Sequence, residues 1–294
     1  MPLCHFSTAI NTTPRLGWVD LGGVYDLSAW EGAGLHSMRN VLARPLAEVR
    51  QLLNDAPFDQ LPVCTHPEAT LHKPLDAQEV WACGVTYLRS RDARMEESSE
   101  QSVYDRVYGA ERPEIFFNAT PSRVVGPGQP LAIRGDSTWD VPEPELALVI
   151  NAGGEIVGYT IGNDVSSRSI EGENPLYLPQ AKMFRDCCGL GPSIALVDEV
   201  TDVANLAIQM TITRSGNAVF QGESNTNQIA RPLEQLVAYL MRANDFPNGA
   251  VLLTGTGIVP PSDFTLESGD VVAITIDGIG TLGNPVYRAY AFSE

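Results

Sequence analysis

The stretch VPEPELALVI, from Val141 to Ile150, is typical of a buried strand that begins with two carboxylates. Glu143 and Glu145 stand two residues apart, so their side chains point to the same side of an extended chain. Their Cα atoms then lie about 7 Å apart, because a strand rises roughly 3.3 Å per residue. The two carboxylates can therefore converge on one ion. Pro144 lacks an N–H group, which favours an edge or the end of a strand at this point.

Two interpretations fit this pair of glutamates. Two unpaired carboxylates at the edge of an apolar core repel each other and lose hydration, and a divalent cation removes both penalties. A solvated Pro-Glu-Pro-Glu turn accounts for the same residues without an ion. These residues alone leave both interpretations open.

A third acid, Asp164, follows the next apolar run, in GYTIGNDVSSRS. Taken singly it also suits a helix cap or an Asx turn. Together with Glu143 and Glu145 it would fill half of the octahedral shell of Mg²⁺ or Mn²⁺ and leave three positions for water or substrate. A 2-keto acid can occupy two of these positions through a carboxylate oxygen and its keto oxygen. The ion then stabilises an enolate beside the ketone.

Two further segments could serve such a site. Lys182 lies in an otherwise apolar run, YLPQAKMF. A buried lysine can donate to an oxyanion or, if its pKa falls, act as a base, whereas an amphipathic lysine reaches out to solvent. The run LLTGTGIVP ends in Thr254 to Gly257, a turn that can offer N–H groups and hydroxyls to a substrate carboxylate. The alternative for this turn is a purely structural role.

Composition excludes several classes of protein. The 294 residues carry 19 basic and 36 acidic side chains, a net charge of -17, so no basic excess is available to bind nucleic acid. The five cysteines show no CxxC pattern, which favours reduced thiols in a cytoplasm. We see no secretory signal and no apolar run of membrane-spanning length. The last histidine is His72, so chemistry further along the chain proceeds without imidazole.

The pattern of elements predicts an α+β fold that is mainly β. We predict a small N-terminal domain over residues 1–76, with helical spacing at 37–56 interrupted by Pro45. In the larger domain, residues 77–294, many short strands are separated by Gly, Pro and Asp. Residues 150–159 and 212–221 are predicted as hairpins, and 231–244 as a helix.

Seven segments, in this order, resemble the fumarylacetoacetate hydrolase superfamily over roughly residues 80–286. They are WACGVTY, RPEIFFNATPSRVVGPG, EPELALVI, GYTIGNDVSSR, LYLPQAK, AVLLTGTG and LESGDVVAITIDGIGTLGNPV. The resemblance implies a mixed, mainly β roll, an assembly that is usually dimeric, and a divalent metal, Mg²⁺ or else Mn²⁺ or Ca²⁺. It assigns the metal to Glu143, Glu145 and Asp164, the active-site lysine to Lys182 and a substrate-contacting threonine to Thr256.

The sequence also departs from the family's hydrolases. These usually carry G-x-N-Y-x-x-H, in which the histidine helps to activate water, whereas this chain has Thr86 for the asparagine and Ser90 for the histidine. Asn118 stands where many members have lysine. The departures argue against C–C hydrolysis. The chain more closely resembles a branch that dehydrates 2-keto-3-deoxypentonates of the arabinonate or xylonate type to 2,5-dioxopentanoate.

The expected mechanism needs a proton acceptor and a proton donor. We expect Lys182 to stabilise or deprotonate the enolate, and Glu114 to transfer a proton at C3 or C4; a salt bridge with Arg112 is the alternative for Glu114. The charged segment 88–112 is predicted as a mostly helical lid. The residues expected to bind substrate are Gly84, Tyr87, Arg89, Ser90, Arg112, Lys182 and Thr256.

Two other functions remain open. A C–C hydrolase for a 2,4-diketo-3-deoxy sugar acid would need another water-activating residue, such as Glu96 or Glu97. A tautomerase-like or non-catalytic member would bind 2-keto acids without eliminating water. In each case we expect a small-molecule partner, no membrane, a homodimer or homotetramer, and a cytoplasmic location.

Overall fold

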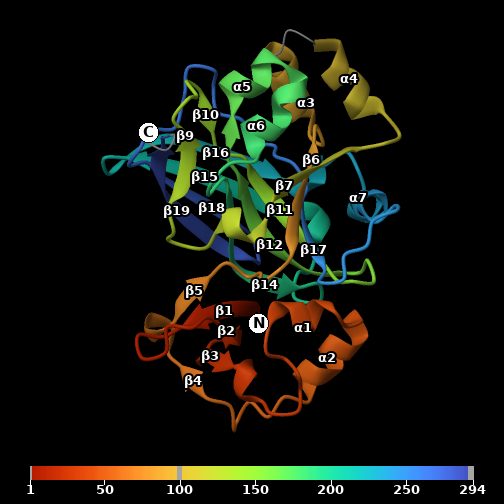
Figure 1. Cartoon of the computed structure of the whole chain (residues 1–294), viewed down its shortest axis with the longest axis vertical. Helices are drawn as coiled ribbons and strands as arrows, with labels where there is room; N and C mark the ends of the chain where they lie inside the picture. Colours follow the sequence, from red (N-terminus) through yellow and green to blue (C-terminus); the bar gives the residue numbers. More distant parts are fainter. Residues whose placement is uncertain (1, 98–100, 291–294) are drawn as a thin grey trace.

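The computed structural model describes residues 2–97 and 101–290. Strands make up 38% of the chain and helices 23%, which confirms the prediction of a mainly β fold. Figure 1 shows the N-terminal region, residues 2–76, at one end of the molecule. Helices α3 (Leu88–Glu97) and α4 (Gln101–Gly109) lie at the opposite end. None of the described helices is long and apolar enough to cross a membrane.

The central sheet extends through both regions. Its strands follow the order β4 (Val63–Cys64), β3 (Gly23–Asp26), β2 (Arg15–Asp20), β1 (Leu3–Ser7), β14 (Cys188–Leu196), β12 (Ile156–Asp164), β11 (Pro144–Ile150), β17 (Ala250–Leu253), β6 (Glu79–Gly84) and β7 (Glu114–Ala119). Two short strands lie off this path: β5 (Thr70–His72) pairs with β1, and β8 (Val124–Val125) pairs with β14. β17 and β6 are parallel, whereas β11 and β12 are antiparallel, so the sheet is mixed as predicted.

A second sheet packs against the central one. Its order is β16 (Asn217–Asn225), β15 (Ala207–Arg214), β18 (Val271–Ile276), β19 (Gly280–Ala289) and β9 (Leu131–Arg134). A short pair, β10 (Asp140–Val141) with β13 (Ser166–Ser167), lies apart from both sheets. The main apolar core contains buried residues of both sheets, such as Leu148 of β11 and Ile274 of β18. The burial of every residue of β11 agrees with the unbroken apolar run from Leu146 to Ile150 that follows Glu145.

The helices are few and short. They include α1 (Met38–Leu42), α2 (Leu46–Asn54), α5 (Arg168–Glu173), α6 (Leu178–Lys182) and α7 (Leu233–Leu240). Pro45 separates α1 from α2, as its position in the helical pattern predicted, because proline cannot donate in a helix interior. The predicted hairpins are confirmed as β11–β12 and β15–β16.

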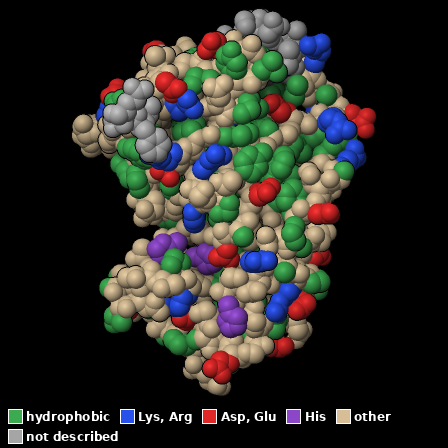
Figure 2. Space-filling model, viewed as in Figure 1, with side chains coloured by type: hydrophobic (Ala, Val, Ile, Leu, Met, Phe, Trp, Pro, Cys, Tyr) green, Lys and Arg blue, Asp and Glu red, His purple; other side chains and the backbone are tan. Residues whose placement is uncertain are grey.

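The N-terminal region has an apolar cluster of its own. This cluster includes Leu16, Leu35 and Val49, and it is completed by residues of the central sheet such as Val149 and Ile194. The region therefore packs against the sheet rather than standing free. Figure 2 shows the histidine side chains gathered over this region on the face in view. The division into domains at residues 76 and 77 stays a prediction.

Candidate metal centre and active site

Strand register brings the three predicted metal ligands together. In the antiparallel pair β11–β12, Pro144 lies opposite Asn163 and Glu145 opposite Gly162, so Glu143 and Asp164 meet at one edge of the sheet. The Asp164 N–H group donates to the Glu143 carbonyl over 3.0 Å. Carboxylate oxygens of Glu143, Glu145 and Asp164 lie within 4.8 Å of one another, and all three side chains are buried. The solvated-turn interpretation of the glutamate pair is therefore wrong.

Neighbouring strands end at the same edge. β17 pairs with β11 and ends at Leu253, so the following turn reaches Glu145, whose Oε2 accepts from the Gly255 N–H group over 2.5 Å. Gly255 has φ +91, and a Cβ there would collide with the Thr86 hydroxyl. That hydroxyl donates to the Thr254 carbonyl over 2.6 Å. Thr86, which replaces the family's asparagine, thus holds the turn in place.

Lys182, at the end of α6, occupies the centre of the acidic cluster. Its Nζ donates to Glu143 Oε2 over 2.5 Å, to Asp164 Oδ2 over 2.7 Å and to Ser166 Oγ over 2.5 Å. The residue is 1% exposed, which excludes the solvent-reaching alternative. Burial lowers the pKa of Lys182, but Asp164 and Glu143 outweigh it and raise this pKa above the usual value. This favours a charged donor over a base.

The carboxylates differ in how well their charge is compensated. Burial, with the charges of Asp164 and Glu143, raises the pKa of Glu145 well above its usual value. Burial also raises the pKa of Asp164, although Lys182 opposes the shift. Burial opposes ionisation of Glu143 too, yet Lys182, Arg168 and other bases hold the pKa of Glu143 below its usual range. The cluster therefore has carboxylate charge that its bases do not neutralise.

A divalent cation fits this arrangement. Three buried carboxylates from two adjacent strands converge, and like-charge repulsion at Glu145 is what a cation would relieve. Oxygen-only donor sets suit Mg²⁺, Mn²⁺ and Ca²⁺. Asn118 donates to Asp164 Oδ1 over 2.8 Å and so fixes the orientation of that carboxylate.

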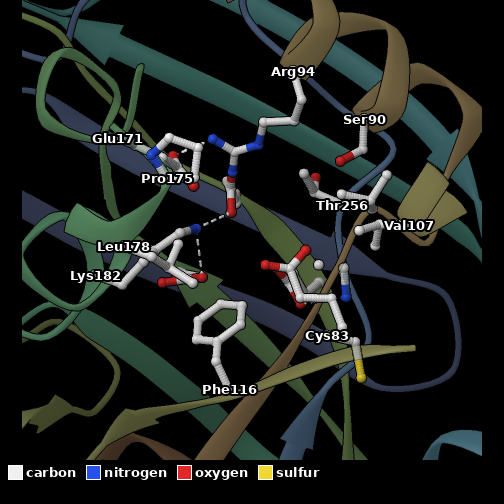
Figure 3. A pocket seen from close by; sticks show the side chains of 17 residues that line it. Cys83, Ser90, Arg94, Val107, Phe116, Glu171, Pro175, Leu178, Lys182 and Thr256 are labelled. Atoms are coloured by element: carbon white, nitrogen blue, oxygen red, sulfur yellow. Dashed lines mark hydrogen bonds and ion pairs between the residues drawn. The ribbon is translucent and has the colours of Figure 1, made fainter. Parts of the chain in front are cut away.

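Figure 3 shows the cavity that surrounds this cluster. Of the predicted site residues, its wall contains Gly84, Ser90, Glu114, Glu143, Glu145, Asp164, Lys182 and Thr256. A Cβ at Gly84 would collide with the Glu114 carboxylate, so glycine there lets that carboxylate face the cavity. Burial raises the pKa of Glu114, although Arg94 opposes the shift. A carboxyl group that holds its proton suits general acid catalysis.

Three predicted residues lie outside the described cavity wall. Tyr87 is fully buried and its ring lies close to Gly257. Arg89 is exposed, and Arg112 lies 5.5 Å from the ring centroid of Tyr239. The substrate-binding roles of Tyr87, Arg89 and Arg112 stay predictions. The side chains of Glu96 and Glu97 fall outside the described residues.

Sequence reasoning missed the arginines of the site. Arg168 of α5 donates to Glu143 Oε1 over 2.6 Å, and Arg94 of α3 reaches the same oxygen over 3.1 Å. Arg94 and Glu171 also line the cavity. Arg168 and Glu171 stand three residues apart, a spacing that puts them on one side of a helix, and this was a usable signal. No local pattern distinguishes Arg94 from the other charged residues of its helix.

Comparisons with known proteins identify the family of the chain. Residues 80–287 match the family model described as fumarylacetoacetate (FAA) hydrolase, C-terminal. A probable 2-keto-3-deoxyxylonate dehydratase from Haloferax volcanii is 52% identical over 245 residues, 83% of this chain and 81% of that protein. A 2-dehydro-3-deoxy-D-arabinonate dehydratase from Saccharolobus solfataricus is 48% identical over 220 residues, 74% of each chain.

A solved structure of a dehydratase is similar to this chain over nearly its whole length. It is described as 2-keto-3-deoxy-D-arabinonate dehydratase complexed with magnesium and 2,5-dioxopentanoate. It superposes with a TM-score of 0.82 at 35% identity and covers 99% of this chain and 100% of that one. The similarity therefore extends over the N-terminal region as well as the larger part of the chain.

Proposed function

The chain belongs to the fumarylacetoacetate hydrolase family, and we propose that within it the protein dehydrates a 2-keto-3-deoxypentonate to 2,5-dioxopentanoate. The observation that carries this proposal is the contact of Lys182 with two members of a buried three-carboxylate cluster. It occurs in a chain about half identical to two proteins named as dehydratases of such acids. The described cavity wall contains no histidine, which argues against a water-activating dyad.

The reaction removes one water molecule and then shifts a proton. Loss of a C3 proton and of the C4 hydroxyl gives an unsaturated keto acid and water. A proton then moves from C5 to the C2 oxygen, which gives a dienol. Protonation of C3 and C4, with loss of the two enol O–H protons, gives the C2 ketone and the C5 aldehyde. A divalent cation such as Mg²⁺, held by Glu143, Glu145 and Asp164, supplies Lewis acidity at the 2-keto group when bound.

The chain's own residues supply the proton chemistry. Lys182, charged and buried, donates to the oxygen on which negative charge develops as the C3 proton leaves. Glu114, whose pKa is raised by burial, takes the C3 proton and passes it to the C4 hydroxyl, which leaves as water. The turn after β17 brings Thr256 into the cavity wall, where its hydroxyl can donate to the substrate carboxylate; the Gly255 N–H group of the same turn is used by Glu145.

A product assay tests this function. Purified protein with Mg²⁺ is incubated with 2-keto-3-deoxy-D-arabinonate and with its L isomer, and products are followed by mass and by coupling to a semialdehyde dehydrogenase. We expect an aldehyde product lighter by one water, lost when chelator is added. Release of pyruvate from a 2,4-diketo acid, with no dehydration, would support the hydrolase instead. Enol–keto exchange without loss of water would support a tautomerase.

The proposal extends to the domain division, the assembly and the cellular location of the protein. The N-terminal domain spans 1–76 and the catalytic domain 77–294, which is supported by the start of the family match at residue 80. The protein forms a homodimer or homotetramer, as the family resemblance implies, and light scattering measures its mass in solution. It acts in the cytoplasm, where its five free cysteines would stay reduced.

A further inference from the structure

Helix α3 projects an arginine into the cavity. Figure 3 shows Arg94 pointing from the helix toward the acidic cluster, and its side chain is only 11% exposed. Arg94 Nη2 lies 3.1 Å from Glu143 Oε1, and Arg94 Nη1 pairs with Glu171 Oε2. Glu143 precedes β11, and Glu171 belongs to α5. One guanidinium group therefore ties α3 to two separate elements across the cavity.

The start of α3 and the end of α4 are held to the rest of the protein by other contacts. The Ala230 N–H group donates to the Thr86 carbonyl over 2.9 Å, just before α3 begins. The Arg231 guanidinium donates over 2.6–3.4 Å to four carbonyls at the end of α4, those of Val107, Tyr108, Ala110 and Glu111. Both ends are thus fixed to one short segment, and Arg94 holds the helix at the cavity itself.

Glu143 cannot hold Arg94 and a divalent cation equally well. Glu143 belongs to the three-carboxylate cluster, so a divalent cation there competes with every base that contacts this carboxylate. Arg94 makes the longest of these contacts, 3.1 Å against 2.6 Å for Arg168 and 2.5 Å for Lys182, so it is the easiest to displace. The cation also repels the guanidinium, and at such short range in a buried site the repulsion is strong. The Arg94 contact with Glu171 does not involve a member of the cluster and is retained, so the cation weakens the hold of Arg94 on Glu143 specifically.

We propose that Arg94 is a positioning residue that holds helix α3 over the cavity and loosens when a divalent cation binds Glu143. The proposal rests on the metal site of the proposed function. It makes cavity access depend on prior cation binding, so that substrate enters a site that already holds its metal. Because linkage is reciprocal, a cation that weakens the hold of Arg94 must itself bind more tightly once Arg94 is removed.

The experiment measures two quantities that do not depend on turnover. Calorimetry gives the Mg²⁺ affinity, and hydrogen–deuterium exchange gives the protection of amides 88–95 with and without Mg²⁺. The variant is Arg94→Gln. Its matched control is Arg91→Gln, which removes the same charge from the same helix; Arg91 pairs with Asp92 over 2.7 Å and lies outside the described cavity wall.

We expect Mg²⁺ to speed exchange of amides 88–95 in the wild type. In Arg94→Gln these amides should exchange fast already, and Mg²⁺ should bind about 10-fold more tightly. Arg91→Gln should match the wild type in Mg²⁺ affinity; it controls for affinity alone, because Arg91 also reaches Asp105 and the Tyr108 ring of α4 and so contributes to the packing of α3. Arg94→Lys keeps the charge but cannot bridge two carboxylates, so it should fall between wild type and Arg94→Gln. This variant also serves if Arg94→Gln does not fold.

Several outcomes overturn the proposal. Unchanged or weaker Mg²⁺ binding in Arg94→Gln does so, as does unchanged exchange of α3 on adding Mg²⁺, or an equal gain of affinity in Arg91→Gln. Absence of Mg²⁺ binding in the wild type overturns both this proposal and the metal site. If Mg²⁺ affinity and exchange shift as expected but no dehydration is found, only the proposed function fails.

Discussion

The cluster around Glu143 and the cluster around Asp270 use the same kinds of side chain but balance their charges differently. Asp270 is fully buried and accepts from Arg214 Nε over 2.7 Å and Arg214 Nη2 over 2.8 Å. The Glu267 N–H group adds a third hydrogen bond over 2.9 Å. One carboxylate thus meets one guanidinium in the two-pronged geometry that gives strong pairs.

The cluster at the metal centre has an excess of acid. Glu145 accepts one hydrogen bond from the Gly255 N–H group, whereas the like charges of Asp164 and Glu143 raise its pKa well above the usual value, after burial itself. A chain selected for stability alone would pair or remove such a group. The difference between the clusters teaches that a functional site can be recognised by buried carboxylates whose negative charge is not matched by neighbouring bases.

Removing the excess acid should have the largest effect and separate activity from stability. We expect Glu145→Gln to lower turnover with Mg²⁺ by about 10⁴-fold, because one of three predicted ligands is lost. In chelator the same change should raise the free energy of unfolding by about 1–2 kcal/mol, since it removes a repelled carboxylate. Product assays and urea unfolding in chelator measure the two effects. Wild-type turnover in this variant would contradict the assignment of Glu145.

Removing Asp270 from the cluster around it should lower stability and leave the metal site unchanged. Asp270→Ala leaves the buried part of Arg214 without its partner, so we expect a loss of about 3–4 kcal/mol in the free energy of unfolding. The Mg²⁺ affinity of the folded protein should stay unchanged. Glu267→Gln is the control, because Glu267 is 57% exposed and its contact with Arg214 is screened by water. A large effect on Mg²⁺ binding in Asp270→Ala would show that the clusters are coupled.

Asp140 is intermediate between Glu145 and Asp270, because it is a buried acid whose nearest base lies beyond hydrogen-bond distance. Burial raises the pKa of Asp140 to about 6, although Ser137 and Arg288 oppose the shift, and Arg288 Nη1 lies 3.7 Å from Asp140 Oδ2. The folded state binds this proton more tightly than the unfolded chain. Its contribution to stability is therefore complete below about pH 4 and is lost as pH rises through about 6.

The expected loss from Asp140 totals at most about 3 kcal/mol, of which about 1 kcal/mol falls between about pH 5 and about pH 8. Urea unfolding of wild type and Asp140→Asn at these two pH values measures it. Asp140→Asn cannot ionise, so its stability relative to wild type should rise by that amount at the higher pH. A constant difference between the two proteins would exclude the raised pKa.

The smallest effect is expected where an ion pair is exposed. Arg50 of α2 pairs with Asp198, and their side chains are 38% and 60% exposed. Water and salt screen this pair, so Asp198→Ala should change the free energy of unfolding by less than about 1 kcal/mol. Thermal unfolding at low and high salt measures the change. A larger loss would mean that this contact fixes the N-terminal region to the sheet.

The sequence by itself predicted the part of the site that local patterns encode. The period of two in a strand placed Glu143 and Glu145 on one side, and the strand exit before Asp164 marked the third carboxylate. The apolar setting of Lys182 pointed to burial, which the structure confirms. The apolar run from Leu146 to Ile150 and the Gly-containing hairpins indicated a mainly β fold.

Only the tertiary structure decided which charged residues reach the cavity. Arg94 comes from a charged helix far along the chain from β11, and Arg89 of the same helix stays exposed. Which side of α3 faces the site depends on how Thr86 and Arg231 anchor α3 and α4. Local periodicity sets the spacing of side chains within an element, whereas their direction in space depends on contacts between elements distant in sequence.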